Sequence, residues 1–72
     1  MKLIKAKQSG KDRPVYINVD NICLFYSDQY DGAYKTKIYF NEGRCEIEGN
    51  HAEAIEKFIT EYPSGLYDLT ED

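Results

Sequence analysis

The 72-residue sequence contains no tryptophan, only one histidine and only two cysteines. Two cysteines are too few for a disulfide scaffold, so we expect Cys23 and Cys45, which lie in apolar runs, to be buried free thiols. No apolar run approaches the ~18 residues of a membrane span. The first residues also lack the continuous apolar stretch of a signal peptide. These absences predict a cytoplasmic protein without membrane contact.

Side chains suited to catalysis or metal binding are equally scarce. His51, Cys23 and Cys45 are the only imidazole and thiol groups, and they show neither C-x-x-C nor H-x-x-x-H spacing. Residues 28–32 do not form a calcium loop, because Tyr30 stands where an oxygen ligand is required. No phosphate-binding glycine loop or G-x-S-x-G motif occurs. We therefore expect a protein that is not an enzyme and has no catalytic, cofactor-binding or metal-binding residues.

The net charge of −4 is unevenly distributed along the chain. Residues 1–13 hold five basic side chains and one acidic side chain, whereas residues 14–72 hold four basic and twelve acidic ones. An acidic chain is repelled by a phosphate backbone, so nucleic-acid binding is disfavoured. Small anions remain possible ligands of the basic segment; the candidate contacts are Lys5, Lys7, Lys11 and Arg13. The alternative is that these charges only protect an edge strand against aggregation.

Alternation of apolar and polar residues predicts a β-rich fold. The first strand is expected at the sheet edge with its lysines outward, and Pro14 is expected to open the second strand. A long hairpin loop is expected over residues 27–33, with a turn at Asp31-Gly32. About five strands are expected, near residues 2–8, 14–19, 22–26, 35–40 and 44–48.

One amphipathic helix is expected to follow the strands and to end before Pro63. Asn50 would begin the helix and would share a capping box with Glu53. The residues of the predicted apolar stripe are Ala52, Ile55, Phe58, Ile59 and Tyr62.

These elements predict an α+β domain over residues 1–62, in which one C-terminal helix packs on an antiparallel β-meander that approaches a small open barrel. Residues 63–72 would form an acidic tail. The predicted core consists of Ile4, Val15, Ile17, Val19, Ile22, Leu24, Ile38, Phe40, Ile47, Ile55, Phe58 and Ile59. Since one core stabilises a chain of this size by only ~3–5 kcal/mol, a homo-oligomer is also expected.

The run 15–22 (VYINVDNI) follows a Gly-Lys pair and precedes a glycine hairpin and an AIEKFI helix. Over residues 2–62 this order resembles the FlbD-like small bacterial proteins, and the strand pattern is also similar to the end of LytTR-type DNA-binding domains. Small phage proteins share it. The resemblance implies the fold described above. It also implies an accessory role in a flagellar operon without catalytic residues.

Seven tyrosines and three phenylalanines form an aromatic surplus. Amphipathic aromatic residues on an outer face favour protein contacts, although tyrosine is also an ordinary strand residue. The candidate partner contacts are Tyr16, Tyr30, Tyr34, Tyr39, Leu66, Tyr67 and Leu69. The leading hypothesis is a small interaction module, such as a phage or mobile-element accessory protein, that binds and modulates a host or defence protein. The alternatives are an oligomeric protein that sequesters a small anion or nucleotide between subunits, and the flagellar accessory role.

Overall fold

The computed structural model describes residues 1–70, and in this range it contains six strands, one 3-10 turn and one α-helix. The elements are β1 (Lys2–Lys7), β2 (Pro14–Asn18), η1 (Val19–Asn21), β3 (Ile22–Tyr30), β4 (Ala33–Phe40), β5 (Gly43–Glu48), α1 (Ala52–Glu61) and β6 (Gly65–Asp68). The α+β class is confirmed. The five-strand meander is wrong, because β6 follows the helix and returns to the sheet.

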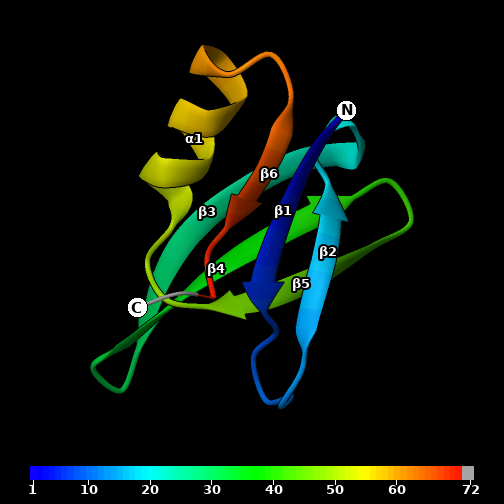
Figure 1. Ribbon diagram of the computed structural model, residues 1–72. Helices are drawn as coiled ribbons and strands as arrows, with labels where there is room; N and C mark the ends of the chain where they lie inside the picture. Colours follow the sequence, from blue (N-terminus) through cyan, green and yellow to red (C-terminus); the bar gives the residue numbers. More distant parts are fainter. Residues whose placement is uncertain (71–72) are drawn as a thin grey trace.

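The strands form two three-stranded sheets, ordered β2-β1-β6 and β3-β4-β5 (Figure 1). All neighbouring strands are antiparallel except β1 and β6, which are parallel. The end of β1 reaches β5 through a bridge between Gln8 and Ile47, and the Ser9 N–H donates to the Glu46 carbonyl at 2.8 Å. The first strand is therefore central, and the expectation of an edge strand is wrong.

The core lies between the two sheets and α1, which sits beside β6 and against β3 (Figure 1). Its buried apolar members are Ile4, Ala6, Ile17, Val19, Ile38, Ile47, Ile55 and Phe58. All of them except Ala6 were predicted, and four further predicted residues pack partly buried around them: Val15, Ile22, Phe40 and Ile59.

Leu24 is the predicted core residue that the structure places outside, with 56% of its surface exposed. The cause is a bulge, since Ile22 pairs with Phe40 but Leu24 pairs with Tyr39, the neighbouring residue on β4. The extra residue, Cys23, changes the face to which every later side chain of β3 points. Cys23 is itself exposed, so its prediction as a buried thiol is also wrong.

The β3–β4 hairpin is longer and tighter than expected. Pairing continues as far as Tyr30 and Ala33, which leaves only Asp31 and Gly32 in the turn, with φ of 49° and 83°. Positive φ at both positions is the geometry that an Asp-Gly pair favours in two-residue hairpins. The predicted turn is correct, whereas the predicted long loop is part of two paired strands.

The start of α1 is capped by the sheet and not by its own flanking residues. His51 occupies the N-cap position without a side-chain hydrogen bond, so the predicted capping box is wrong. The His51 N–H donates to Thr36 Oγ1 at 2.9 Å, and the Ala52 N–H donates to Ser27 Oγ at 3.2 Å. The helix ends before Pro63 as predicted, and within residues 1–70 no helix is long and apolar enough to cross a membrane.

Residues 65–68, which the sequence analysis placed in the tail, form β6 along β1. The Gly65 N–H donates to the Met1 carbonyl at 3.0 Å, and the Leu69 N–H donates to the Lys5 carbonyl at 2.7 Å. The Tyr67 ring lies 5.3 Å from the Phe58 ring, between their centroids. This segment therefore completes the first sheet, while Glu71 and Asp72 lie outside the described residues.

Candidate interaction surface

The outer side of the β3-β4-β5 sheet gathers exposed aromatic residues. Side chains alternate along β3, so Phe25 and Ser27 face inward while Leu24, Tyr26 and Tyr30 face outward. On β4, Lys37 lies opposite Tyr26, and Tyr39 lies opposite Leu24. We call the surface formed by Leu24, Tyr26, Tyr30, Lys37 and Tyr39 the tyrosine face.

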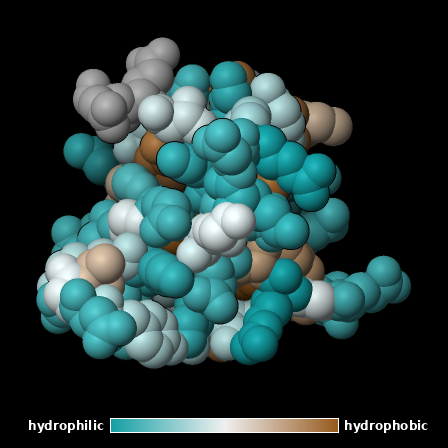
Figure 2. Space-filling view, turned by 90° about the horizontal axis from the view of Figure 1, so that it is seen from below, coloured by the Kyte–Doolittle hydropathy of each residue, from teal (hydrophilic) through white to brown (hydrophobic). Residues whose placement is uncertain are grey.

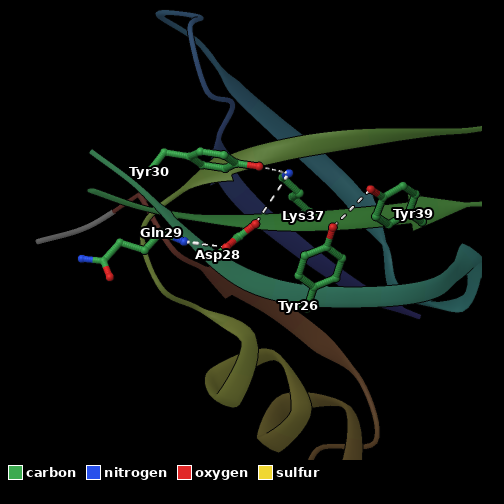
Figure 3. A network of polar contacts seen from close by, with 6 residues as sticks. All are labelled: Tyr26, Asp28, Gln29, Tyr30, Lys37 and Tyr39. Atoms are coloured by element: carbon green, nitrogen blue, oxygen red, sulfur yellow. Dashed lines mark hydrogen bonds and ion pairs between the residues drawn. The ribbon is translucent and has the colours of Figure 1, made fainter. Parts of the chain in front are cut away.

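Lys37 lies at the centre of the tyrosine face (Figure 3). Its Nζ donates to the Tyr30 hydroxyl and lies 3.9 Å from Asp28 Oδ2. The same nitrogen is 4.7 Å from the centroid of the Tyr30 ring and 6.0 Å from that of Tyr26. The hydrogen bond to Tyr30 is the main cause that raises the pKa of Lys37. These contacts leave only 15% of the Lys37 side chain exposed, so the ammonium group orders the rings around it.

Tyr26 and Tyr39 form the second contact of the tyrosine face. Their rings stack at a centroid distance of 6.1 Å and an interplanar angle of 16°, and their hydroxyl oxygens are 3.4 Å apart (Figure 3). The shared hydrogen bond raises the pKa of Tyr26 and lowers the pKa of Tyr39. Arg44, the cross-strand neighbour of Tyr39, lowers the pKa of Tyr39 further.

Charges of both signs surround the aromatic residues. On the outer side of the sheet, Lys35 is paired with Glu48, and Lys37 is paired with Glu46. Opposite charges across neighbouring strands stabilise a sheet and leave no strong field of one sign. An exposed aromatic group within a balanced polar rim is the composition of protein-binding surfaces, and differs from the basic surface that binds nucleic acid.

The structure divides four of the five predicted contact tyrosines among three places. Tyr30 and Tyr39 lie on the tyrosine face. Tyr16 lies on the outer side of the other sheet, 62% exposed, with Lys5 Nζ 6.0 Å from its ring centroid. Tyr34 pairs with Gln29 and therefore points to the opposite side of the hairpin from Tyr30.

The remaining predicted contacts lie along β6 and just after it. Leu66 is exposed on the outer side of its sheet, whereas Tyr67 and Leu69 pack against the core. Sequence reasoning missed Tyr26 and Lys37. The signal for Tyr26 was the recurrence of Leu24, Tyr26, Asp28 and Tyr30 at every second position of one strand. The prediction of a loop over residues 27–33 concealed this pattern.

Three of the four candidate anion contacts come together. Lys5, Lys7 and Arg13 line an open hollow of about 240 Å³ with Asp12, Pro14 and Thr70, whereas Lys11 does not line it. The hollow is not uniformly basic, because Asp12 belongs to it. Asp68 lies beside it on β6; hydrogen bonds from Thr70, and then the charge of Lys5, lower the pKa of its carboxyl group.

Groups for covalent or metal chemistry do not gather in the part of the chain that the structure describes. Within residues 1–70, no three His, Cys, Asp or Glu side chains are placed to hold a metal ion. The Cys23 thiol lies 3.0 Å from Asn41 Oδ1 and donates to it, and burial raises the pKa of the Cys45 thiol. A raised pKa lowers the thiolate fraction and with it the reactivity of Cys45.

Viewed from the end that carries the β1–β2 and β3–β4 turns, the molecule is mainly hydrophilic, with apolar residues in small separate areas (Figure 2). Comparison with known proteins found no matching family model, no matching curated protein and no matching solved structure.

Proposed function

We propose that the protein is a non-enzymatic interaction module that binds a protein partner through the tyrosine face. The observation that carries this proposal is the ordered group that the exposed Tyr26 and Tyr30 and the half-buried Tyr39 form around Lys37. Tyrosine contributes a large contact area with few rotatable bonds, and side chains that are already ordered lose little entropy on binding. A host or defence protein bound by a phage or mobile-element accessory protein is the partner class we propose, and a flagellar protein is the alternative class.

The test is affinity capture from bacterial lysate with the whole chain as bait. The face variant is Tyr26→Ala/Tyr39→Ala, which removes both stacked rings. The matched control is Tyr16→Ala, because Tyr16 is also an exposed tyrosine beside a lysine but lies on the other sheet. Thermal unfolding of each variant establishes that it is folded.

We expect a protein that wild type and Tyr16→Ala retain equally and that the face variant retains at least about tenfold less. Equal recovery of the same proteins by all three baits would exclude the tyrosine face as the contact surface. Loss with Tyr16→Ala alone would move the interface to the β2-β1-β6 sheet. Sedimentation equilibrium on the same variants tests the proposed homo-oligomer and shows whether the bound protein is a second copy of the chain.

A second candidate function, small-anion binding, is favoured by the hollow that joins Lys5, Lys7 and Arg13. Isothermal titration with inorganic phosphate and with a nucleoside triphosphate tests it at low salt, and Lys7→Gln/Arg13→Gln is the variant. Heat of binding in wild type that the variant lacks would support this function. Absence of heat up to about 1 mM ligand would exclude it.

A further inference from the structure

A groove of about 380 Å³ runs between α1 and β6, away from the tyrosine face. Phe58, Tyr62, Leu66 and Tyr67 contribute most of its apolar lining, and Ala54 and Lys57 extend it along the helix. Phe58 is the buried floor, 5% exposed, and its ring lies 5.8 Å from that of Tyr62 and 5.3 Å from that of Tyr67, between centroids. Contacts among the rings thus hold the apolar walls in place.

One wall of the groove is the edge of a sheet. β6 is the last strand in the order β2-β1-β6, so among residues 1–70 only one of its two sides is paired. Hydrogen bonds from the N–H groups of Gly65 and Leu69 reach β1, and backbone groups alternate in direction along a strand. The N–H and C=O groups of Leu66 and Asp68 therefore point away from β1, toward the groove side. An edge of this kind pairs readily with another extended chain.

Apolar side chains flank this edge at the surface. Tyr62 is 54% exposed and Leu66 is 55% exposed, on the helix side and the strand side respectively. A strand added beside β6 would direct every second side chain toward the inner side of the sheet, where the groove lies. The combination of free backbone groups with an apolar groove is typical of sites that bind an extended peptide, because the backbone supplies affinity and the groove selects side chains.

The charge beside the groove indicates which peptide fits. Ala54 and Lys57 also line a neighbouring hollow on the exposed side of α1, whose other residues are Glu53, Glu56, Thr60 and Glu61. Three carboxylates and one ammonium group give this side of the helix a net negative charge. Basic residues of a bound peptide that face the helix, two positions before and two positions after the residue in the groove, would lie close to these carboxylates, whereas a second copy of this chain would bring its own acidic helix to the same place.

We propose that β6 accepts an extended basic peptide as an additional strand, with one apolar side chain of the peptide in the groove over Phe58. This site is separate from the tyrosine face, so either one can exist without the other. The expected ligand is a segment of a partner protein in which Val, Leu or Phe has Lys or Arg two residues before it and two residues after it, so that these three side chains face the helix.

The probe is a pool of fluorescent peptides of about nine residues, the length of an ordinary strand, with that spacing and small polar residues at the positions between; we call it the alternating basic pool. Control pools have the same composition with all basic residues at one end, or Glu in place of Lys and Arg. We expect the alternating basic pool to bind the full chain at least about tenfold more tightly than either control by fluorescence anisotropy, which is a difference of about 1.4 kcal/mol. No binding of the alternating pool up to about 1 mM protein would overturn the proposal.

Backbone pairing is tested with the tightest peptide, N-methylated at its odd or at its even residues. Strand addition uses the N–H groups of only one set, so one methylated peptide should lose at least about tenfold in affinity and the other should not. In spectra of the labelled protein, the amide signals of Leu66 and Asp68 should shift and those of Tyr26 and Tyr39 should not. Equal effects of the two methylation patterns, or shifts confined to the tyrosine face, would overturn the proposal.

Two protein variants separate the groove from the edge. Ala54→Phe should fill the groove and reduce affinity at least about fivefold, whereas Thr60→Phe, which is on α1 but outside the groove, should not. Leu66→Pro removes an outward N–H without removing a bond to β1, and should weaken binding more than Leu66→Ala. If Leu66→Pro does not fold, the N-methylated peptides answer the same question. If wild type forms a homodimer that Ala54→Phe dissociates, a second copy of the chain covers the edge of β6. That result would overturn the proposal that a basic peptide occupies it.

Discussion

The β3–β4 hairpin has one polar network on each side, and the two are built from neighbouring residue pairs. Ser27 and Thr36 face inward, where Thr36 is fully buried, whereas Tyr26 and Lys37 face outward, one position along each strand. The inner network connects the sheet to the helix. Among the described residues, 1–70, the outer network has its contacts within the β3-β4-β5 sheet. This difference separates a polar group that stabilises the fold from one that is available to a partner.

The inner network is a chain of hydrogen bonds in which each hydroxyl both donates and accepts. The Ala52 N–H donates to Ser27 Oγ at 3.2 Å, and Thr36 Oγ1 donates to the Gly49 carbonyl at 2.8 Å. Since the Thr36 proton is directed to Gly49, the Ser27 hydroxyl is the donor in its 3.3 Å contact with Thr36. Three groups at the helix start, the His51 and Ala52 N–H groups and the Gly49 carbonyl, are therefore satisfied by two side chains from the sheet.

Thr36→Val should have the largest effect on stability. The substitution keeps the shape of the side chain but leaves the His51 N–H and the Gly49 carbonyl without their partner. Leaving buried groups unpaired costs about 1–3 kcal/mol, which we expect as a loss in the free energy of unfolding measured with urea. The control is Thr60→Val, because the Thr60 hydroxyl bonds only to carbonyls of its own exposed helix. Equal losses in the two variants would show that the buried network does not hold the helix start.

Gly49→Ala tests the same junction from the backbone. Gly49 has φ of 98°, and a Cβ there would lie 2.5 Å from Nε2 of His51, so the imidazole would have to move. A non-glycine residue in such a conformation costs about 1–3 kcal/mol. Because the His51 ring can rotate away from the new Cβ, we expect a loss in the free energy of unfolding in the lower half of that range. Gly43→Ala is the control, since a Cβ at Gly43 meets nothing within 4 Å. If the two alanine variants unfold at the same urea concentration, the close approach of the new Cβ to His51 does not change the free energy of unfolding.

Local patterns were sufficient to predict much of the fold. The alternation around Ile17 predicted β2, and the helical spacing of Ile55 and Phe58 predicted α1. Gly32 predicted the hairpin turn and Pro63 predicted the end of the helix, because both residues influence the backbone conformation within a few positions of themselves. These features depend on neighbours in the sequence, and a single sequence contains that information.

The features that were missed depend on contacts between distant residues. The bulge at Cys23 is set by pairing with β4, and it moves Leu24 from the core to the tyrosine face. β6 exists because β1 offers an unpaired side, and its four residues have no strong strand pattern of their own. Two of the five residues of the tyrosine face, Tyr30 and Tyr39, were among the predicted partner contacts. Their arrangement around Lys37 required the register of the hairpin, because the pairing decides which side chains share a face.

The outer network should respond to pH and leave stability unchanged near neutrality. In the folded protein, Tyr26 donates to Tyr39 once Tyr39 is ionised. The pKa of Tyr39 is therefore lowered, and the pKa of Tyr26, which must give up that donated proton, is raised. We expect Tyr39 to ionise below, and Tyr26 above, the ordinary tyrosine pKa of about 10. Carbon-13 labelling of the tyrosine Cζ atoms and NMR titration from neutral to alkaline pH would measure both.

Tyr26→Phe sharpens this prediction because it removes one hydroxyl and keeps the stacked ring. The pKa of Tyr39 should then rise toward its ordinary value, and Arg44 should account for the part that remains lowered. Tyr39→Phe should in turn lower the pKa of Tyr26, because it removes the hydrogen bond to Tyr39 that is the main cause of the raised value. An unchanged pKa of Tyr39 in Tyr26→Phe would mean that the two hydroxyls are not bonded in solution. The tyrosine face would then be less ordered than the inner network, and its rings would have to be fixed by the partner at the moment of binding.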